Sequence, residues 1–332
     1  MRLPRFDYLE PETVAEACGL LQNHQGESQV LAGGTDLLIA MKQRRLRPKY
    51  LIALHKIKEL KGIKSEENAI TLGPLTCLQE IVDSSLVRSQ LPVLAQAAWE
   101  VGSPLIRSVA TIGGNLCLDN RCRYYNQSAF WRQANDPCRK AGGIKCLVTG
   151  REDRCHATFS SDAAPALIAL GAEITIQSAD GDSTIPLADF YTGKGESPNR
   201  ADGSIVLTKV RIPLSPEGMR GSYRKYRKRE SIDFPLVGAA VTLGLAGETC
   251  TAAQVVLTGV GSGPVIAGNA AKQLIGQKLT PKVADACADA VVKEIMPFHT
   301  DFSTPGYKRK VAGLLVAESI KELGGISGEE SH

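Results

Sequence analysis

The sequence predicts a mixed α+β (α/β) protein built from two domains. Its 332 residues suffice for about two domains with at least one sizeable hydrophobic core. Early in the chain, helical and strand-like periodicities alternate, and paired glycines form turns at LAGGTDLL (31–38) and ATIGGN (110–115). Beyond a boundary predicted near residue 218, two alternating strands precede three helical stretches. We therefore expect one domain over 1–218 and a second over 219–325.

The first domain is expected to begin with helices and strands in alternation. Farther along, ENAITLGPLTCLQEIVDSSLV repeats the strand-to-helix pattern, and LPVLAQAAWEVGS has helical spacing. SSDAAPALIALGAEITIQSADGDSTIPLADF predicts a helix and two strands, and SIVLTKVRIPL predicts a strand before the loop LSPEGM. The elements expected in the first sixty residues are a helix over 12–22, a strand over 29–32, a helix over 36–46 and a strand over 50–54.

The second domain is expected to be a hairpin followed by helices. VGAAVTLGLAG and CTAAQVVLTGVG alternate like strands, and AGET between them predicts the turn. Three helical stretches follow near 268–276, 281–296 and 305–322. The polar tail over 326–332 is predicted to be disordered.

Composition and charge exclude several functional classes. Net charge is only +4, and the basic runs at 42–49 and 223–230 lack interleaved aromatic residues beyond Tyr223 and Tyr226, so nucleic acid is not an expected partner. The first run is interpreted as a solvated helix end, and the second as facing solvent or a partner subunit. The chain has no apolar secretory segment at its start and no run of about 18 apolar residues. A cytoplasmic protein without a membrane span is expected.

The two glycine turns have the character of a phosphate cradle. Paired glycines let backbone amides approach an anionic group, and Thr35 and Asp36 are placed to cap the following helix. Neither turn matches G-x-G-x-x-G or a P-loop, and a single turn of this kind is usually an ordinary tight turn. Two of them in one domain make a pyrophosphate site credible without identifying the nucleotide.

The nine cysteines fall into two groups. Cys18, Cys77, Cys250 and Cys287 stand alone and are interpreted as small core hydrophobes. The other five crowd into residues 117–155. Four thiolates on one centre suit either a structural zinc ion or an iron–sulfur cluster. The spacings of 16, 8 and 9 between Cys122, Cys138, Cys146 and Cys155 contain no C-x₂₋₄-C pair, which disfavours zinc.

LAGGTDLL, ATIGGN and SDAAPALIALGAEI, in this order, resemble the FAD subunit of the molybdenum hydroxylases, which include xanthine dehydrogenase and carbon monoxide dehydrogenase. The resemblance runs from FDYLEPETVAEA to DFSTPGYKRKVAGLLV. It implies a two-part, PCMH-type FAD-binding domain and a C-terminal α+β domain of the CO dehydrogenase flavoprotein type. Asp162 matches a family residue near the nucleotide end of FAD, and Leu207 and Lys225 match positions near the flavin end. The glycine-loop residues implied to bind FAD are Ala32, Gly33, Gly34, Thr35, Asp36, Leu37, Thr111, Gly114 and Asn115.

The cysteine segment lies in an insertion at about 117–157, where most members of this family have a short link. NLCLDNRC, YYNQS, KC and DRC-ATF-SD resemble the β subunits of 4-hydroxybenzoyl-CoA reductases. That resemblance implies a [4Fe-4S] cluster on Cys122, Cys138, Cys146 and Cys155. Cys117, which follows the GGN turn, is treated as a non-ligand, and His156 as a surface or outer-shell residue. Residues 117–156 hold eight basic and four acidic residues, a balance suited to an anionic cluster or acidic carrier, or equally to a solvated loop.

The resemblance implies an electron-transfer subunit with no catalytic residue of its own. Electrons from a low-potential, ferredoxin-like donor would pass through the cluster and FAD to a small [2Fe-2S] subunit and a large molybdopterin subunit, in a dimer of heterotrimers. The large subunit would then dehydroxylate 4-hydroxybenzoyl-CoA or a similar substrate. An aldehyde or heteroaromatic hydroxylase with the opposite electron flow is the nearest alternative. A stand-alone flavin oxidase and a zinc-stapled scaffold are more distant ones.

Overall fold

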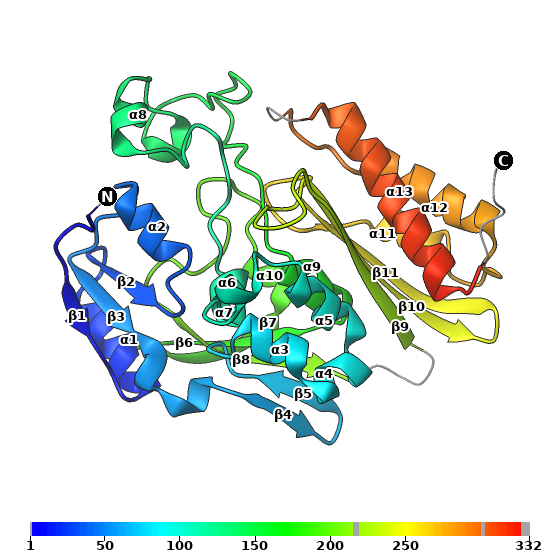
Figure 1. Ribbon diagram of the computed structural model, residues 1–332, viewed down its shortest axis with the longest axis horizontal. Coiled ribbons are helices and arrows are strands. Elements are labelled where there is room, and N and C mark those ends of the chain that lie inside the picture. The colour runs from blue at the N-terminus through cyan, green and yellow to red at the C-terminus, as the bar shows by residue number, and fades with distance from the viewer. Residues whose placement is uncertain (1, 215–218, 300–302, 327–332) are drawn as a thin grey trace.

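The computed structural model describes residues 2–214, 219–299 and 303–326. Its described strands form three sheets, and its helices lie between and against them (Figure 1). The boundary predicted near residue 218 and most of the predicted tail fall outside the described residues. Among the described helices, none combines the length and the apolar character needed to cross a membrane.

The chain begins with a small parallel sheet in the order β1-β3-β2. A parallel pair needs a crossover; α2 lies in the connection between the paired strands β2 and β3, and β1 is connected to β2 by the amphipathic helix α1. Val14, Ala17, Cys18 and Leu21 form its buried face, as their spacing predicts. The elements are β1 (Asp7–Leu9), α1 (Val14–Asn23), β2 (Ser28–Leu31), α2 (Leu37–Lys42) and β3 (Tyr50–Ala53), followed by the 3₁₀ turns η1 (Leu54–Lys56) and η2 (Lys58–Leu60).

A five-stranded antiparallel sheet forms the second part of this domain. Its order is β4-β5-β8-β6-β7, so the late strand β8 pairs between strands from two earlier hairpins. Short helices form a layer against it, and α9 is buried along its whole length. The strands are β4 (Ile63–Glu66), β5 (Ala69–Leu72), β6 (Glu173–Ser178), β7 (Gly181–Pro186) and β8 (Val206–Pro213). The helices are α3 (Leu78–Asp83), α4 (Ser85–Gln90), α5 (Pro92–Trp99), α6 (Pro104–Arg107), α7 (Ile112–Leu116), α9 (Ala163–Ala169) and α10 (Leu187–Phe190).

The C-terminal part is an antiparallel sheet in the order β12-β11-β10-β9 with helices on one face (Figure 1). The predicted hairpin and three helices are present, and the sequence reasoning missed β9, because its alternating basic residues were interpreted only as a charge run. The elements are β9 (Met219–Tyr226), β10 (Val237–Ala246), β11 (Thr249–Thr258), β12 (Val265–Ile266), α11 (Gly268–Lys272), α12 (Pro281–Glu294) and α13 (Pro305–Leu323).

The two parts share one hydrophobic core. Tyr223, Ala240 and Val256 of the C-terminal sheet belong to the same buried cluster as Leu94 of α5 and Leu167 of α9. Strand β10 is almost entirely buried because its other face packs beneath the C-terminal helices. This shared core holds the C-terminal sheet firmly against the helices that carry the second glycine loop.

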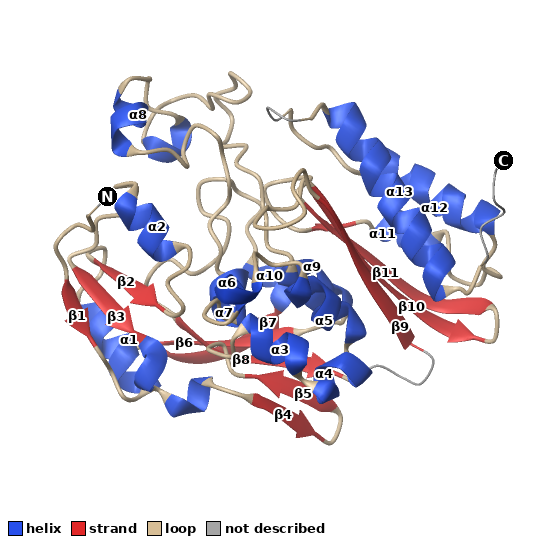
Figure 2. Cartoon of the chain, in the orientation of Figure 1, coloured by secondary structure: helices blue, strands red, loops and turns tan. Residues whose placement is uncertain are grey.

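The cysteine segment forms a loop-rich extension from this body (Figure 2). Arg121 and Thr158 exchange backbone hydrogen bonds of 2.8 Å in each direction, so the extension begins and ends at one point. Within it lie only the short helix α8 (Ala129–Gln133) and the 3₁₀ turn η3 (Arg139–Ala141). The amide of Ala129 donates to the carbonyl of Gln43 at 3.0 Å, which ties α8 to the end of α2.

Candidate functional site

The first glycine loop presents free backbone donors. Among the hydrogen bonds of the described residues, none is donated by the backbone amides of Gly33, Gly34, Thr35 or Asp36. Gly34 has a φ of +72°, a conformation that glycine adopts without strain. Consecutive open amides before a helix form the kind of concavity that binds phosphate. The predicted capping by Thr35 and Asp36 is wrong: neither side chain caps α2, and Asp36 instead pairs with Arg121 of the insertion.

The two glycine loops meet directly. A Cβ atom at Gly33 would lie 1.9 Å from the carbonyl oxygen of Val109, so only glycine allows this approach. Gly113 in the second loop packs on Pro74, where a Cβ atom at Gly113 would lie 2.8 Å from the Cβ atom of Pro74. Thr111 caps α7 by accepting a hydrogen bond from the amide of Gly114 at 3.1 Å. The two segments that the sequence predicts as one cradle are therefore in contact, although they are far apart along the chain.

Asn115 connects the second loop to the next motif. Its Oδ1 atom accepts hydrogen bonds from Ser161 Oγ at 2.7 Å and from the amide of Ala163 at 3.3 Å. Asp162 lies between those two residues at the start of α9, where it is 3% exposed. The side chain of Asn115 thus fixes the position of the buried aspartate relative to the glycine loop.

Asp162 is held in a buried ion pair with Lys225. Lys225 Nζ lies 2.9 Å from Asp162 Oδ2. The hydroxyl of Tyr223 donates a hydrogen bond of 2.6 Å to Oδ1 of the same carboxylate. Burial raises the pKa of Asp162, although Lys225 and Tyr223 oppose this shift. Asp162 and Lys225, which the resemblance matches to the nucleotide end and the flavin end of FAD, are thus in direct contact with each other. Leu207 is buried in the main core, with its backbone on β8.

The glycine-loop geometry fits a dinucleotide. The open amides of the first loop would supply donors for a pyrophosphate, and Gly33 packs directly on the backbone of Val109 and Ala110 in front of the second loop. Tyr223 and the carbonyl of Glu100, which accepts from Lys225 Nζ at 2.9 Å, complete the buried polar group. Sequence reasoning missed both residues, since neither lies in a recognisable motif.

The four predicted ligand cysteines gather in the insertion. Burial raises the pKa of the Cys122 thiol, and the nearby thiolates of Cys138 and Cys146 raise it further. Burial also raises the pKa of Cys155 to about 12, and the charge of Cys122 adds to that effect. Each thiol of this group is therefore near enough to at least one other to act on it electrostatically. In the part of the chain that is described, no three or more His, Cys, Asp or Glu side chains are arranged to hold a metal ion.

Backbone donors point at two of these sulfurs. The amides of Tyr124 and Tyr125 donate to Cys122, and the amide of Ala157 donates to the sulfur of Cys155 at 3.4 Å. These hydrogen bonds oppose the effect of burial, which nevertheless leaves the pKa of both thiols raised. Amide donors of this kind stabilise thiolates and also tune iron–sulfur centres.

The remaining cysteines differ from this group. Cys18, Cys250 and Cys287 are buried, as predicted for core hydrophobes, whereas Cys77 is half-buried at the start of α3. Cys117 packs at the edge of the main core, where burial raises its pKa to about 12. His156 is not a surface residue, because its side chain is buried. Its ring lies edge-on to the ring of Phe298, with 4.5 Å between the two ring centroids.

The two basic runs are less solvated than predicted. Helix α2 ends at Lys42, and the chain then turns inward, so the side chain of Arg45 is only 2% exposed. In the second run, Arg224 pairs with Glu318 and Glu322 of α13, and Arg227 pairs with Glu100. Several charges expected to face solvent or a partner thus form contacts inside the chain.

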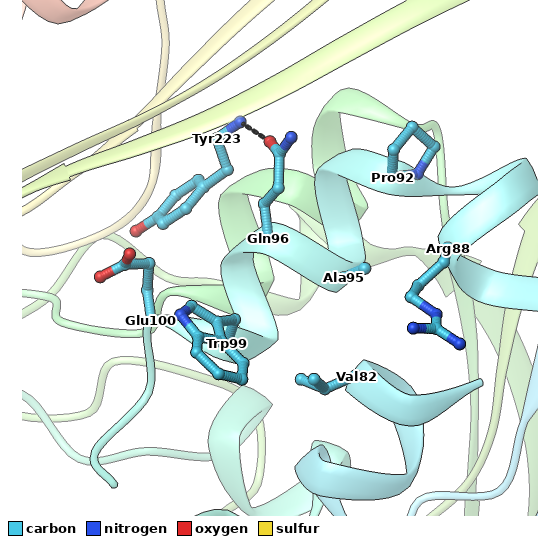
Figure 3. Close-up of a pocket in the computed structure, with 8 residues that line it drawn as sticks. All are labelled: Val82, Arg88, Pro92, Ala95, Gln96, Trp99, Glu100 and Tyr223. Atoms are coloured by element: carbon cyan, nitrogen blue, oxygen red, sulfur yellow. Dashed lines mark hydrogen bonds between the residues drawn. The ribbon is translucent and has the colours of Figure 1, made fainter. Parts of the chain in front are cut away.

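Among the described residues, cavities also open outside the glycine loops. One of about 370 Å³ opens between α3, α4, α5 and β9, and the labelled residues in Figure 3 line it. Gln96 projects from α5 there and accepts from the amide of Tyr223 at 2.7 Å (Figure 3). Another, of about 490 Å³, lies between the end of α2 and the insertion, with Arg44, Arg132, Trp131 and Cys138 in its wall.

Two family models match the chain. FAD binding domain in molybdopterin dehydrogenase matches residues 4–215, and CO dehydrogenase flavoprotein C-terminal domain matches residues 222–323. The first match covers more than half of the chain. The protein therefore belongs to the FAD-binding flavoproteins of the molybdenum hydroxylase family, and the predicted fold class is confirmed.

Relatives of named function are similar to this protein along most of the chain. The carbon monoxide dehydrogenase medium chain of Hydrogenophaga pseudoflava is 27% identical over 317 residues, which cover 96% of either chain. The nicotinate dehydrogenase FAD-subunit of Eubacterium barkeri is 29% identical over 285 residues, covering 85% of this chain and 83% of that one. A solved structure of carbon monoxide dehydrogenase from H. pseudoflava, which lacks the Mo-pyranopterin moiety of its molybdenum cofactor, matches with a TM-score of 0.80. That match has 26% identity and covers 97% of this chain and 98% of that chain.

Proposed function

We propose that the protein is the electron-transfer subunit of a molybdenum-containing aromatic-CoA reductase. The glycine loops would hold FAD, and Cys122, Cys138, Cys146 and Cys155 would hold a [4Fe-4S] cluster. When bound, these groups would supply electron transfer between a low-potential, ferredoxin-like donor and partner subunits with [2Fe-2S] clusters and a molybdopterin site. There 4-hydroxybenzoyl-CoA or a similar substrate would take up two electrons and two protons and lose its aryl hydroxyl group as water.

The gathering of four thiols in the insertion carries this proposal. The insertion contains no C-x₂₋₄-C pair, which is the usual ligand spacing of a structural zinc site. The electrostatic effect of Cys138 and Cys146 on Cys122, together with the amide donors on Cys122 and Cys155, supports a centre shared by the four thiolates.

The chain's own residues would position the cofactors and perform no acid–base step. When bound, FAD exchanges electrons singly or in pairs, which lets it connect one-electron and two-electron centres. The open amides of the first loop would hold its pyrophosphate, and the buried Asp162–Lys225 pair would fix one end of the site. The insertion, which begins beside Arg121 and its partner Asp36, would keep the cluster next to the FAD cradle.

The second candidate is an FAD-binding subunit of a molybdenum hydroxylase in which electrons leave through FAD. The names of the relatives favour it, because carbon monoxide and nicotinate dehydrogenases oxidise their substrates. The two candidates share the cofactors and partners and differ in the direction of electron flow.

Cofactor analysis tests the shared part of the proposal. Protein purified without oxygen should contain about four irons, about four acid-labile sulfides and about one FAD per chain. Cys138→Ser should lose iron and keep FAD, whereas Cys117→Ala, the matched control, should keep both. One zinc per chain without sulfide would overturn the cluster.

Turnover of the purified complex separates the two directions. With reduced methyl viologen as donor, 4-hydroxybenzoyl-CoA should be converted to benzoyl-CoA, and Cys138→Ser should abolish this conversion. A complex that reduces an oxidised dye with aldehydes or heteroaromatic compounds, and leaves 4-hydroxybenzoyl-CoA unchanged, would establish the hydroxylase instead.

A further inference from the structure

We infer that Lys140, held with Arg45 and Asp119 around the ring of Tyr125, is a positioning residue that raises the reduction potential of the centre on the four cysteines. These residues also connect that centre to the first glycine loop. The inference rests on the proposed function and adds to it a named set of tuning residues, which we call the cation bridge: Arg45, Asp119, Tyr125 and Lys140.

Cationic side chains from separate parts of the chain lie near the ring of Tyr125. The guanidinium carbon of Arg45 lies 5.5 Å from the ring centroid, and Lys140 Nζ lies 5.2 Å from it. Arg132 is a third cation at 5.9 Å. The negative face of an aromatic ring attracts such groups, and more strongly where water is excluded. Cys138 acts electrostatically on Tyr125, so the ring also lies near the predicted ligands.

The cation bridge is buried and poor in negative charge. The side chains of Arg45 and Lys140 are 2% and 5% exposed, and both pair with the single carboxylate of Asp119. Among the described residues, buried nitrogens of Arg45, Arg121 and Arg132 have no hydrogen-bond partner. Buried cations need compensation by a nearby negative group. A cluster bound by four thiolates would supply it.

One end of the bridge reaches Cys155 through Gly195. Lys140 Nζ donates to the carbonyl of Gly195 at 2.8 Å. Gly195 packs so closely that a Cβ atom there would lie 2.8 Å from the sulfur of Cys155. The ammonium group of Lys140 is therefore separated from this sulfur only by Gly195, a position from which a buried cation stabilises negative charge on the sulfur.

The other end reaches the FAD cradle. Asp36 of the first glycine loop acts on Arg45 and forms an ion pair with Arg121. Removing Arg45 should therefore affect both the flavin loop and the cysteine centre, whereas removing Lys140 should affect mainly the cysteine centre.

The cation bridge should change the reduction potential because reduction of the cluster by one electron changes its net charge. A single electron added to the cluster, from the low-potential donor, increases its negative charge by one and breaks no bond. A buried cation beside Cys155 stabilises the reduced form more than the oxidised form, because charges in a water-poor site are weakly screened. Lys140 should therefore make reduction easier, and Asp119 should oppose it.

The test is a potentiometric titration of the purified complex, with the reduced cluster followed by electron paramagnetic resonance. Lys140→Met should lower the reduced-to-oxidised ratio about tenfold at a fixed potential, equivalent to about 59 mV. Asp119→Asn should raise the reduced-to-oxidised ratio. In the double variant Lys140→Met/Asp119→Asn, the ratio should return toward the wild-type value. Lys145→Met, which removes an exposed charge beside Cys146, is the matched control and should change the ratio much less.

The outcomes distinguish this inference from the proposed function. If wild-type protein shows no cluster signal, the proposed function fails and the inference with it. If the signal is present but Lys140→Met and Lys145→Met give equal potentials, only the cation bridge is wrong. Shifts of the same sign in Lys140→Met and Asp119→Asn would indicate structural damage in place of a charge effect, and would also overturn the inference.

Discussion

Gly33 shows how a single hydrogen atom in place of a side chain permits the flavin cradle. Its Cα lies against the carbonyl of Val109, and this contact aligns the open amides of the first loop with the second loop. Gly19 lies in α1 and has no neighbouring atom within 4 Å of the position of a Cβ. The two glycines therefore respond to the same substitution in opposite ways.

Gly33→Ala should weaken FAD binding strongly and destabilise the fold by about 1–3 kcal/mol, because the added methyl group forces the two loops apart. Gly19→Ala should leave FAD binding unchanged and stabilise α1 by about 0.5–1 kcal/mol. Flavin content after gel filtration and urea unfolding measure both effects. Full flavin retention by Gly33→Ala would contradict the contact between the loops.

Lys308 introduces a pH dependence. Its ammonium group is buried in the C-terminal part and donates to the carbonyl of Gly259 at 2.9 Å, and burial lowers its pKa to about 8. The unfolded chain holds this proton up to the usual lysine range, so the unfolded state binds more protons between about pH 8 and pH 10.5. Folding stability attributable to Lys308 therefore rises with pH across that window.

The difference in unfolding free energy between wild type and Lys308→Met should grow in favour of wild type from pH 8 to pH 10, by about 2 kcal/mol. Chemical denaturation at each pH measures it, and subtracting the variant removes the contribution of other titrating groups. A difference that stays constant with pH would show that the buried lysine keeps its ordinary pKa.

At the scale of elements, the insertion begins and ends at one point of the fold. Its two ends pair at Arg121 and Thr158, and its contacts with the body include the ion pair of Arg139 with Glu196 and the backbone hydrogen bond from Ala129 to Gln43. The strands of the five-stranded sheet and both glycine loops come from segments outside the insertion. We therefore expect the cradle to form without it.

Replacing residues 122–157 by a short Gly-Ser linker should remove iron from the protein while FAD remains bound, because the paired ends of the segment are already adjacent. Iron and flavin per chain give the result. Loss of flavin together with iron would show that the extension supports the cradle.

At the scale of the whole molecule, the two parts behave as one cooperative structure. The C-terminal sheet contributes Tyr223, Ala240 and Val256 to the main core, and the Asp162–Lys225 pair crosses the same interface. Interfaces of this hydrophobic, charge-paired kind resemble a core more than a contact between independent domains.

Thermal unfolding of the chain should therefore occur in a single transition, with calorimetric and van't Hoff enthalpies in agreement. Scanning calorimetry under reducing conditions tests this. Two separated transitions would mean that the parts unfold independently despite the shared core.

Sequence reasoning found the parts of the fold that depend on local patterns. The period of α1, the hairpin of β10 and β11, and the glycine loops all follow from short stretches of residues. It failed where a distant partner decides the outcome: Arg45 turns inward toward Asp119 and Tyr125, and the basic run at Arg224 is a strand paired with acidic residues of α13. The contact of Asp162 with Lys225 was missed for the same reason, since only the folded chain brings those motifs together.

Because the FAD cradle requires the contact between Gly33 and Val109, FAD binding also depends on completed folding. A chain that has not brought these distant segments together has no pyrophosphate site, so FAD binds the native form and ignores the unfolded one. At a hundredfold excess over its dissociation constant, such a ligand adds about 2.7 kcal/mol to stability. Bound flavin then marks molecules in which these segments have met, and flavin-poor growth conditions should yield protein that proteases degrade more readily.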